Sequence, residues 1–206
     1  MNFRGLRELF TKIEHRKEEL GQVNGQVDVT VTILEVYNES IRDLLTRSKS
    51  FDKFEIRQTK DGQVYVENLT ETPVRNFEEV LDLMDRAETN RSVGAHNLNE
   101  HSSRSHLVVT VTVAAQAKNG MHTRGKLNLI DLAGSERLDK TEAIGTRQKE
   151  AAYINKSLSA LGNVIGALES RNSGKRSSKA SHVPFRDSKL TYLLQDSLSG
   201  GSKVSI

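Results

Sequence analysis

The chain has 206 residues, and its 35% apolar and 28% charged content is ordinary for one soluble globular domain. It has no cysteine, which excludes a disulfide framework and a thiolate zinc site, and no apolar run approaches the ~20 residues of a membrane span. The net charge of +3 identifies no partner, but residues 170–190 carry six basic side chains against one acid. This excess favours a polyanionic surface as the partner, with a solvated Ser/Lys-rich loop as the alternative.

Helix and strand patterns alternate at the start of the chain. Apolar residues at helical spacing predict an amphipathic helix over residues 2–20, which Gly21 ends. Alternating apolar and polar residues then predict a strand over residues 27–37. Residues 38–45 are predicted to form a short helical turn.

A hairpin and a second helix are predicted next. The Asp61-Gly62 pair favours a tight turn between strands at residues 54–58 and 64–66. Residues 77–89 have the apolar spacing of a helix whose hydrophobic side faces inward.

Two further strands are predicted at residues 106–117 and 125–131, with a hairpin over residues 118–124 between them. The hairpin contains a partial match to a Walker A phosphate loop that ends on a Gly-Lys pair. Leu127 stands where that loop needs Ser or Thr, and the stretch leads into a strand where a phosphate loop must open a helix. The match is therefore rejected.

The longest helical pattern covers residues 147–169, a second helix is predicted over residues 186–198, and residues 203–206 begin another strand. The apolar face expected on the long helix consists of Ile154, Leu158, Leu161, Ile165 and Leu168. The face expected on the second helix consists of Leu190, Leu193, Leu194 and Leu198.

The stretch Gly125-Lys-Leu-Asn-Leu-Ile-Asp-Leu-Ala-Gly-Ser-Glu136 ends a buried strand on an acid and a glycine turn. Asp131 is expected at the carboxyl edge of a sheet, where ligands bind in open α/β folds, and its carboxylate suits Mg²⁺ directly or through water. Gly134 has no side chain, so its N–H can approach a terminal phosphate closely. Such a loop can sense the phosphate, although this stretch alone also fits a plain strand end and turn.

A second stretch, Asn99-Glu-His-Ser-Ser-Arg-Ser-His106, leads directly into the apolar run at residues 107–113. The hydroxyls of Ser102 and Ser103 can ligate a metal or position a water. Arg104 offers a charge-assisted partner for a carboxylate such as that of Glu136.

These two stretches, N-x-x-S-S-R-S-H and D-L-A-G-S-E, resemble switch I and switch II of the kinesin motor domain, in the family's order and spacing. Residues 150–158 are similar to the start of the family's main microtubule-facing helix. Residues 182–198 are similar to its tubulin-binding loop and following helix. Phe185 and Tyr192 look more like the C-terminal-motor, minus-end-directed kinesins than the transport kinesins.

The resemblance implies an α/β fold, part of a kinesin-type P-loop NTPase motor domain with a central mostly-β sheet flanked by helices. Residues 1–206 are expected to form a single partial motor domain without the N-terminal phosphate-loop portion. Switch I is expected at residues 97–106, switch II at residues 131–136, and the microtubule-facing helices and loop at residues 147–198.

The resemblance also implies a site for ATP and Mg²⁺. Asp131 and Ser103 are expected at the metal, Gly134 at the γ-phosphate, and an Arg104–Glu136 salt bridge is expected to close the switches. The residues assigned to catalysis are Ser102, Ser103, Arg104 and Glu136, and those assigned to nucleotide binding are Asn99, Ser102, Ser103, Asp131 and Gly134.

The expected partner is the microtubule, in the cytoplasm, with neither membrane nor nucleic acid as a partner. Dimerisation is possible through segments absent here. The residues assigned to tubulin contact are Asn155, Lys156, His182, Arg186 and Lys189. Tyr192 departs from the basic residue that transport kinesins often have at its position.

Two functions remain open. The first is a microtubule-stimulated ATPase motor of which this chain is an incomplete part. The second is a non-catalytic microtubule-binding module or pseudo-motor, because no phosphate loop is present in these residues. A nucleic-acid binder is a third possibility on charge alone, but aromatic residues do not alternate with the basic residues of that segment.

Overall fold

The structure is a computed structural model that describes residues 3–21, 26–46, 54–93, 104–117, 120–134, 146–172, 182–199 and 202–204. The elements in chain order are α1 (Phe3–Gly21), β1 (Gln26–Tyr37), β2 (Ser40–Asp43), β3 (Ile56–Gln58), β4 (Val64–Val66), β5 (Thr72–Pro73), α2 (Phe77–Val93), β6 (His106–Gln116), β7 (His122–Asp131), α4 (Thr146–Asn172), the 3-10 helix η1 (Phe185–Asp187), α5 (Lys189–Leu193) and α6 (Gln195–Leu198).

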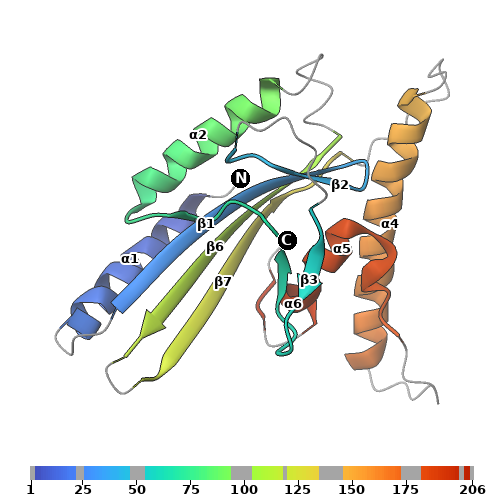
Figure 1. Ribbon diagram of the computed structural model, residues 1–206. Coiled ribbons are helices and arrows are strands. Elements are labelled where there is room, and N and C mark those ends of the chain that lie inside the picture. The colour runs from blue at the N-terminus through green and yellow to red at the C-terminus, as the bar shows by residue number, and fades with distance from the viewer. Residues whose placement is uncertain are drawn as a thin grey trace.

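An antiparallel sheet in the order β2-β1-β6-β7 forms the centre of the fold, and β5 pairs with β1 (Figure 1). The ladder between β1 and β6 runs from Gln26 opposite Gln116 to Val36 opposite His106. Because β6 and β7 are also antiparallel, the start of β6 lies beside the end of β7. That end of the sheet lies next to α4 (Figure 1).

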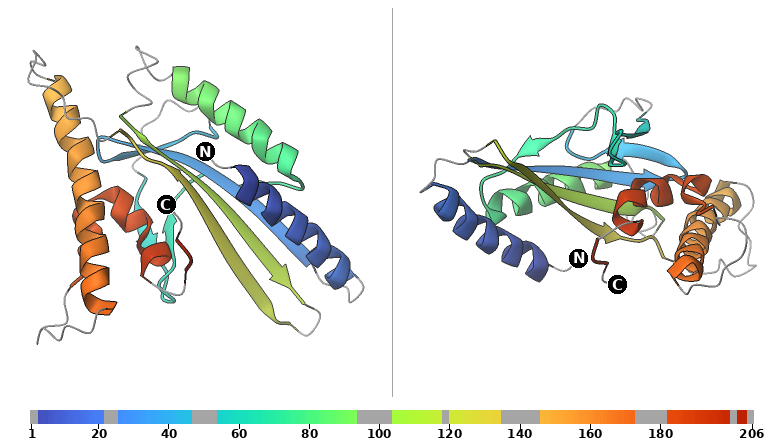
Figure 2. Two further views of the ribbon diagram at one scale, coloured as in Figure 1. Left: turned by 180° about the vertical axis from the view of Figure 1, so that it is seen from behind. Right: turned by 90° about the horizontal axis from the view of Figure 1, so that it is seen from below.

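Different elements cover the two faces of the sheet. The odd-numbered residues Val29, Val31 and Ile33 of β1 are buried with side chains of α1 and α2, which lie on the same face (Figure 2). The even-numbered residues Leu34 and Val36 pack with the β3–β4 hairpin and α5. The two-residue period of a strand therefore produces two separate cores.

Most predicted elements are confirmed. The helix and strand patterns at the start of the chain correspond to α1 and β1, and the later ones correspond to α2, β6, β7 and α4. The β3–β4 hairpin also forms as predicted, and Gly62 has the left-handed φ of +84° that its tight turn needs. The rejected phosphate-loop match lies in the β6–β7 hairpin, where Gly125 and Lys126 pair with β6, so the rejection is confirmed.

The helical turn predicted over residues 38–45 is wrong, because this segment returns along β1 as strand β2. Asn38 and Glu39 have φ of 50° and 56°, and two left-handed residues make the tight turn that joins antiparallel strands. Neither residue is glycine, which hid the turn from the sequence. The carboxylate of Glu39 accepts a hydrogen bond of 2.9 Å from the backbone N–H of Lys189, and this contact helps to hold the unusual turn.

The single helix predicted over residues 186–198 is also wrong, since it is divided into η1, α5 and α6. Ser188 has an extended backbone, and its side chain and that of Thr191 form a capping box that starts α5 anew. Leu190, Leu193 and Leu194 are buried as predicted. The strand predicted at residues 203–206 does not begin within residues 202–204, and the last two residues lie outside the described ranges.

The buried face of α4 is displaced from the predicted one. Among the described side chains of α4, Ser157, Ala160 and Val164 are buried, whereas Leu158 and Leu161 are only half-buried. Val164 packs with Val183 and with Phe185 of η1, and Leu168 is partly buried against the same cluster. The side chain of Ile154 lies outside the described part of α4.

The carboxylate of Asp43 is 3% exposed and accepts hydrogen bonds of 2.8 Å from the backbone N–H groups of Leu45 and Thr70. Asp43→Ala leaves both donors without this acceptor, so we expect the free energy of unfolding to fall by about 2–5 kcal/mol in chemical denaturation. The exposed Asp28 is the control, and Asp28→Ala should cost less than about 0.5 kcal/mol. Equal stability of the two variants would contradict this role of Asp43.

Candidate functional site

The described parts of the two switch-like segments, residues 104–106 and 131–134, lie at one end of the sheet because of strand pairing. Leu107, the second residue of β6, lies opposite Asp131, the last residue of β7. All described strand pairs are antiparallel, so this meeting comes from paired strand ends and not from the carboxyl edge of a parallel sheet. The side chain of Asp131 is exposed there, and Gly134 is half-buried three residues later.

The strand that leads to Asp131 is less buried than predicted. Leu127, Leu129 and Ile130 are half-buried, because β7 has β6 as its only neighbour in the described sheet. Leu127 and Leu129 contact the core beneath α1 and α2, and Ile130 contacts the core on the other face. The strand is therefore anchored on both faces while its last residue reaches solvent.

Only part of the predicted nucleotide site falls on described residues. Arg104 lies in the turn before β6 and is half-buried. Four members of the set lie outside the described ranges, and so does the expected Arg104–Glu136 salt bridge. These residues are Asn99, Ser102, Ser103 and Glu136.

The described residues fit a hydrated magnesium ion better than a caged metal. Within the described ranges, no group of three or more His, Asp or Glu side chains is arranged to hold a metal. Mg²⁺ needs no such cage, since it keeps several waters and binds through one or two carboxylates together with substrate phosphates. The exposed carboxylate of Asp131 at a strand end is suited to that mode.

His106, the first residue of β6, connects three elements of the site. Its Nδ1 accepts a hydrogen bond of 3.0 Å from the backbone N–H of Ala133, which follows β7. Its Nε2 lies 2.8 Å from the hydroxyl oxygen of Ser157 on α4. A backbone N–H can only donate, so Nδ1 carries no proton, and the neutral ring donates from Nε2 to Ser157. The imidazole is 3% exposed, and burial lowers its pKa from 6.5 to about 4.

A buried ionic cluster holds the residue before His106. Glu35 of β1 is 1% exposed and accepts hydrogen bonds from Arg91 Nε at 3.0 Å and from the Ser105 hydroxyl at 2.6 Å. Arg91, at the end of α2, also donates to the Ser105 hydroxyl at 2.8 Å. The cluster fixes the start of β6 to β1 and α2.

Sequence reasoning assigned no role to Glu35, Arg91 or the ring of His106. One signal for Glu35 was available, because it follows Val31 and Ile33 on the apolar face of an alternating strand. A carboxylate at such a position needs a buried partner. The partner is Arg91, which is 56 residues away in the sequence, so it can be identified only from the tertiary structure.

The described tubulin-contact candidates lie on α4 and on the segment around η1 and α5, which pack against each other. Asn155 and Lys156 are exposed on α4. His182 and Arg186 are also exposed, and Lys189 is half-buried. The guanidinium of Arg186 lies 5.4 Å from the ring centroid of Tyr192, so the aromatic variant at that position supports a neighbouring cation.

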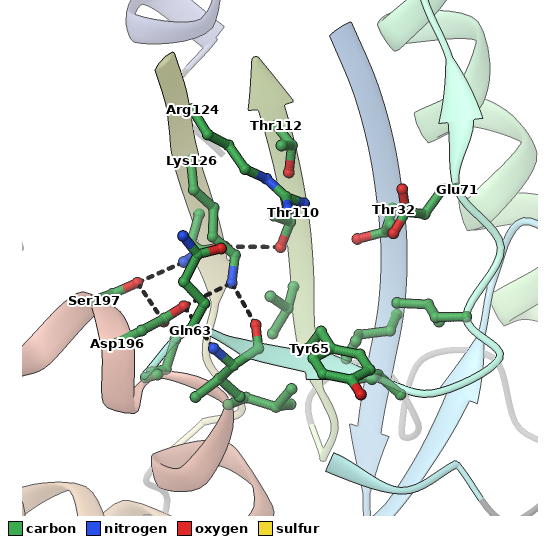
Figure 3. Close-up of a pocket in the computed structure, with 18 of the residues that line it drawn as sticks. Thr32, Gln63, Tyr65, Glu71, Thr110, Thr112, Arg124, Lys126, Asp196 and Ser197 are labelled. Carbon is green, nitrogen blue, oxygen red and sulfur yellow. Dashed lines mark hydrogen bonds and ion pairs between the residues drawn. The ribbon is translucent and has the colours of Figure 1, made fainter. Parts of the chain in front are cut away.

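A polar hollow of about 470 Å³ lies between β7, the β3–β4 hairpin and α6 (Figure 3). Lys126 donates to the Asp196 carboxylate at 3.0 Å and to the carbonyl of Val64 at 2.9 Å. Asn128 donates to the hydroxyl of Ser197 at 2.7 Å. These contacts fasten α6 to the sheet, and none of the described nucleotide or tubulin candidates lines the hollow.

The lowered pKa of His106 predicts a pH effect on stability. Between pH 6.5 and about 4 the unfolded chain binds a proton at this position that the folded chain excludes. The stabilisation is therefore complete above pH 6.5 and is lost as the pH falls towards 4. Chemical denaturation at several pH values should show a shallower pH dependence for His106→Asn than for the parent chain. The control His122→Asn, at an exposed position of β7, should keep the parent's slope, and an equal slope in all three would contradict the assignment.

Comparison with known proteins identifies the family. The sequence pattern of the kinesin motor domain matches residues 1–206. Kinesin-like protein KIN-14E of Oryza sativa subsp. japonica is 50% identical over 205 residues, and kinesin-like protein KIN-14R of Arabidopsis thaliana is 48% identical over 205 residues. Each alignment covers 99% of this chain and 18% of the relative, so the chain spans less than a fifth of their length.

Solved structures agree with this assignment. The C-terminal motor and motor homology domain of Kar3Vik1, fused to a synthetic heterodimeric coiled coil, matches with a TM-score of 0.79 and 41% identity over 96% of this chain and 49% of that chain. The motor domain of the kinesin-like protein Kar3 from Saccharomyces cerevisiae matches with a TM-score of 0.74 and 39% identity over 96% of this chain and 58% of that chain. The resemblance to C-terminal-motor kinesins is thereby confirmed, and the chain belongs to the kinesin motor domain family.

Proposed function

We propose that this chain forms the switch and filament-facing part of a microtubule-stimulated ATPase motor. The observation that carries the proposal is the junction at His106, where the segment entering β6, the segment leaving β7 and α4 are joined by hydrogen bonds. A motor needs such a junction, because the presence of a phosphate at one site must alter filament affinity at another. Family membership and the two switch motifs support the same reading.

The proposed nucleotide site is built from the two segments that meet beside this junction. Asp131 would hold Mg²⁺ through water, together with the hydroxyl of Ser103, and the bound ion would neutralise charge on the phosphates. The backbone N–H of Gly134 would donate to the γ-phosphate of ATP. Ser102 and Ser103 would line the metal and the attacking water, and Asn99 would line the nucleotide.

The proposed closing contact is the salt bridge between Arg104 and Glu136. Arg104 enters β6 and Glu136 follows β7, so an attraction between them would draw the two switch segments together around ATP. Closure would exclude bulk water and organise the attacking water and its proton transfer.

The proposed partner is the acidic surface of the microtubule. The exposed cation Lys156 on α4 and the exposed cation Arg186 in η1 belong to elements that pack against each other, which supports a joint contact surface. Asn155, His182 and Lys189 are proposed to complete it. The protein would act in the cytoplasm on the microtubule cytoskeleton, and dimerisation would require segments outside this chain. Among the described helices, none is both long enough and apolar enough to cross a bilayer.

A non-catalytic microtubule-binding module is the second candidate. It is favoured by one observation, namely that these 206 residues contain no usable phosphate loop, since the nearest match is part of a β-hairpin. Such a module would bind filaments through α4 and α5 without turning over ATP.

Phosphate release in Mg·ATP separates the two candidates when it is measured on the full-length protein that contains these residues. We expect microtubules to increase the rate. We expect Asp131→Asn and Glu136→Ala each to lower the stimulated rate by roughly 10²-fold, since the first weakens the hold on Mg²⁺ and the second breaks the closing salt bridge. The control is Asp61→Asn, in the exposed β3–β4 turn. Filament binding without any ATP turnover would favour the module over the motor.

The tubulin contact is tested by charge reversal. Arg186→Glu combined with Lys189→Glu should weaken microtubule binding by roughly 10-fold or more and flatten its dependence on salt, because attractive charge pairs are replaced by repulsion. Co-sedimentation over a range of ionic strengths measures both effects. Lys60→Glu, on the exposed β3–β4 turn, is the matched control. Binding that matches the control at every salt concentration would remove these residues from the interface.

A further inference from the structure

The ring of His106 makes one hydrogen bond to the loop that follows β7 and another to α4. Nδ1 accepts from the backbone N–H of Ala133 at 3.0 Å, and Nε2 is 2.8 Å from the hydroxyl of Ser157. Both partners are themselves buried, with Ala133 4% and Ser157 3% exposed. Water therefore has little access to these two hydrogen bonds and does not readily replace either one when it is lost.

The position of Ala133 makes this bond sensitive to the proposed phosphate contact. Ala133 immediately precedes Gly134, whose N–H is the proposed donor to the γ-phosphate. Successive backbone units share a peptide plane, so a shift of Gly134 towards a phosphate also moves its neighbour. The imidazole is rigid, and a displacement at Nδ1 therefore changes the geometry at Nε2.

The other end of the contact lies beside the proposed filament surface. Ser157 follows the exposed residues Asn155 and Lys156 on α4, and its own side chain points into the protein. A change at the Ser157 hydroxyl therefore acts on the turn of the helix that presents these two side chains.

The backbone of His106 provides a fixed point between the two. Ser105, the preceding residue, is held by Glu35 and Arg91 in the buried cluster, and His106 itself pairs with Val36 in the sheet. The ring is consequently anchored on the core of the sheet and not on the loop after β7 or on α4.

We propose that His106 is a positioning residue that couples the loop after β7 to α4 through Ser157, so that nucleotide state sets the position of the filament-facing helix. This inference rests on the proposed function. It assigns to His106 neither a contact with nucleotide nor one with tubulin.

The test compares microtubule Kd with Mg·ADP and with a non-hydrolysable Mg·ATP analogue, using the full-length protein that contains these residues. The ratio of the two Kd values measures the coupling between the sites. His106→Asn keeps an acceptor near the Nδ1 position but cannot reach Ser157, and Ser157→Ala removes only the hydroxyl. We expect each variant to reduce the ratio by roughly five- to tenfold.

The double variant identifies the shared bond. If both residues act through one hydrogen bond, His106→Asn combined with Ser157→Ala reduces the ratio no further than either single variant. The control Ser159→Ala changes an exposed hydroxyl two residues away on the same helix and should leave the ratio intact.

The outcomes separate this inference from the proposed function. A parent protein whose Kd does not depend on nucleotide contradicts the proposed function and removes the coupling with it. If the Kd of the parent protein depends on nucleotide and Ser157→Ala leaves the ratio of the two Kd values unchanged, the role of His106 is wrong but the proposed function stands. Thermal unfolding of each variant establishes that it is folded, and Ser157→Ala decides the matter if His106→Asn does not fold.

Discussion

The antiparallel pairing of β6 with β7 is the constraint on which the proposed site depends. It places the residue that enters one strand beside the residue that leaves the other, so Leu107 lies opposite Asp131 and the two switch-like segments share one end of the sheet. The same end lies next to α4 (Figure 1), and His106 makes the connection between sheet and helix through a buried hydrogen bond.

The buried polar groups around this junction serve geometry more clearly than stability. The desolvation energy of a buried ion pair such as Glu35 with Arg91 roughly offsets the Coulomb attraction between the two charges. Removal of one partner leaves the other charge buried without compensation. The pair's hydrogen bonds to Ser105 fix where β6 begins. Apolar side chains of similar volume would lack the hydrogen bonds that hold Ser105.

The sequence predicts the repetitive part of this fold well and its exceptional contacts poorly. Periodicity is sufficient for α1, β1, α2 and β6, because apolar residues recur at helical spacing in the two helices and at alternate positions in the two strands. It fails at Asn38 and Glu39, where non-glycine residues adopt left-handed conformations, and at Ser188, where a capping box interrupts a helical pattern. The motifs predict Asp131 and Gly134 at the strand end, but the roles of Glu35 and His106 depend on partners distant in sequence. The assignments of Asn99, Ser102, Ser103 and Glu136 stay predictions.

Amide hydrogen exchange of the full-length protein, compared between Mg·ADP and a non-hydrolysable Mg·ATP analogue, examines the junction itself. The Ala133 amide, which donates to His106, reports on the loop after β7, and the amides around Ser157 report on α4. If phosphate sensing and filament contact are mechanically joined, exchange at both places changes with nucleotide. If amide exchange changes with nucleotide only in the loop after β7 and stays the same in α4, the result would contradict the coupling and leave the two sites independent.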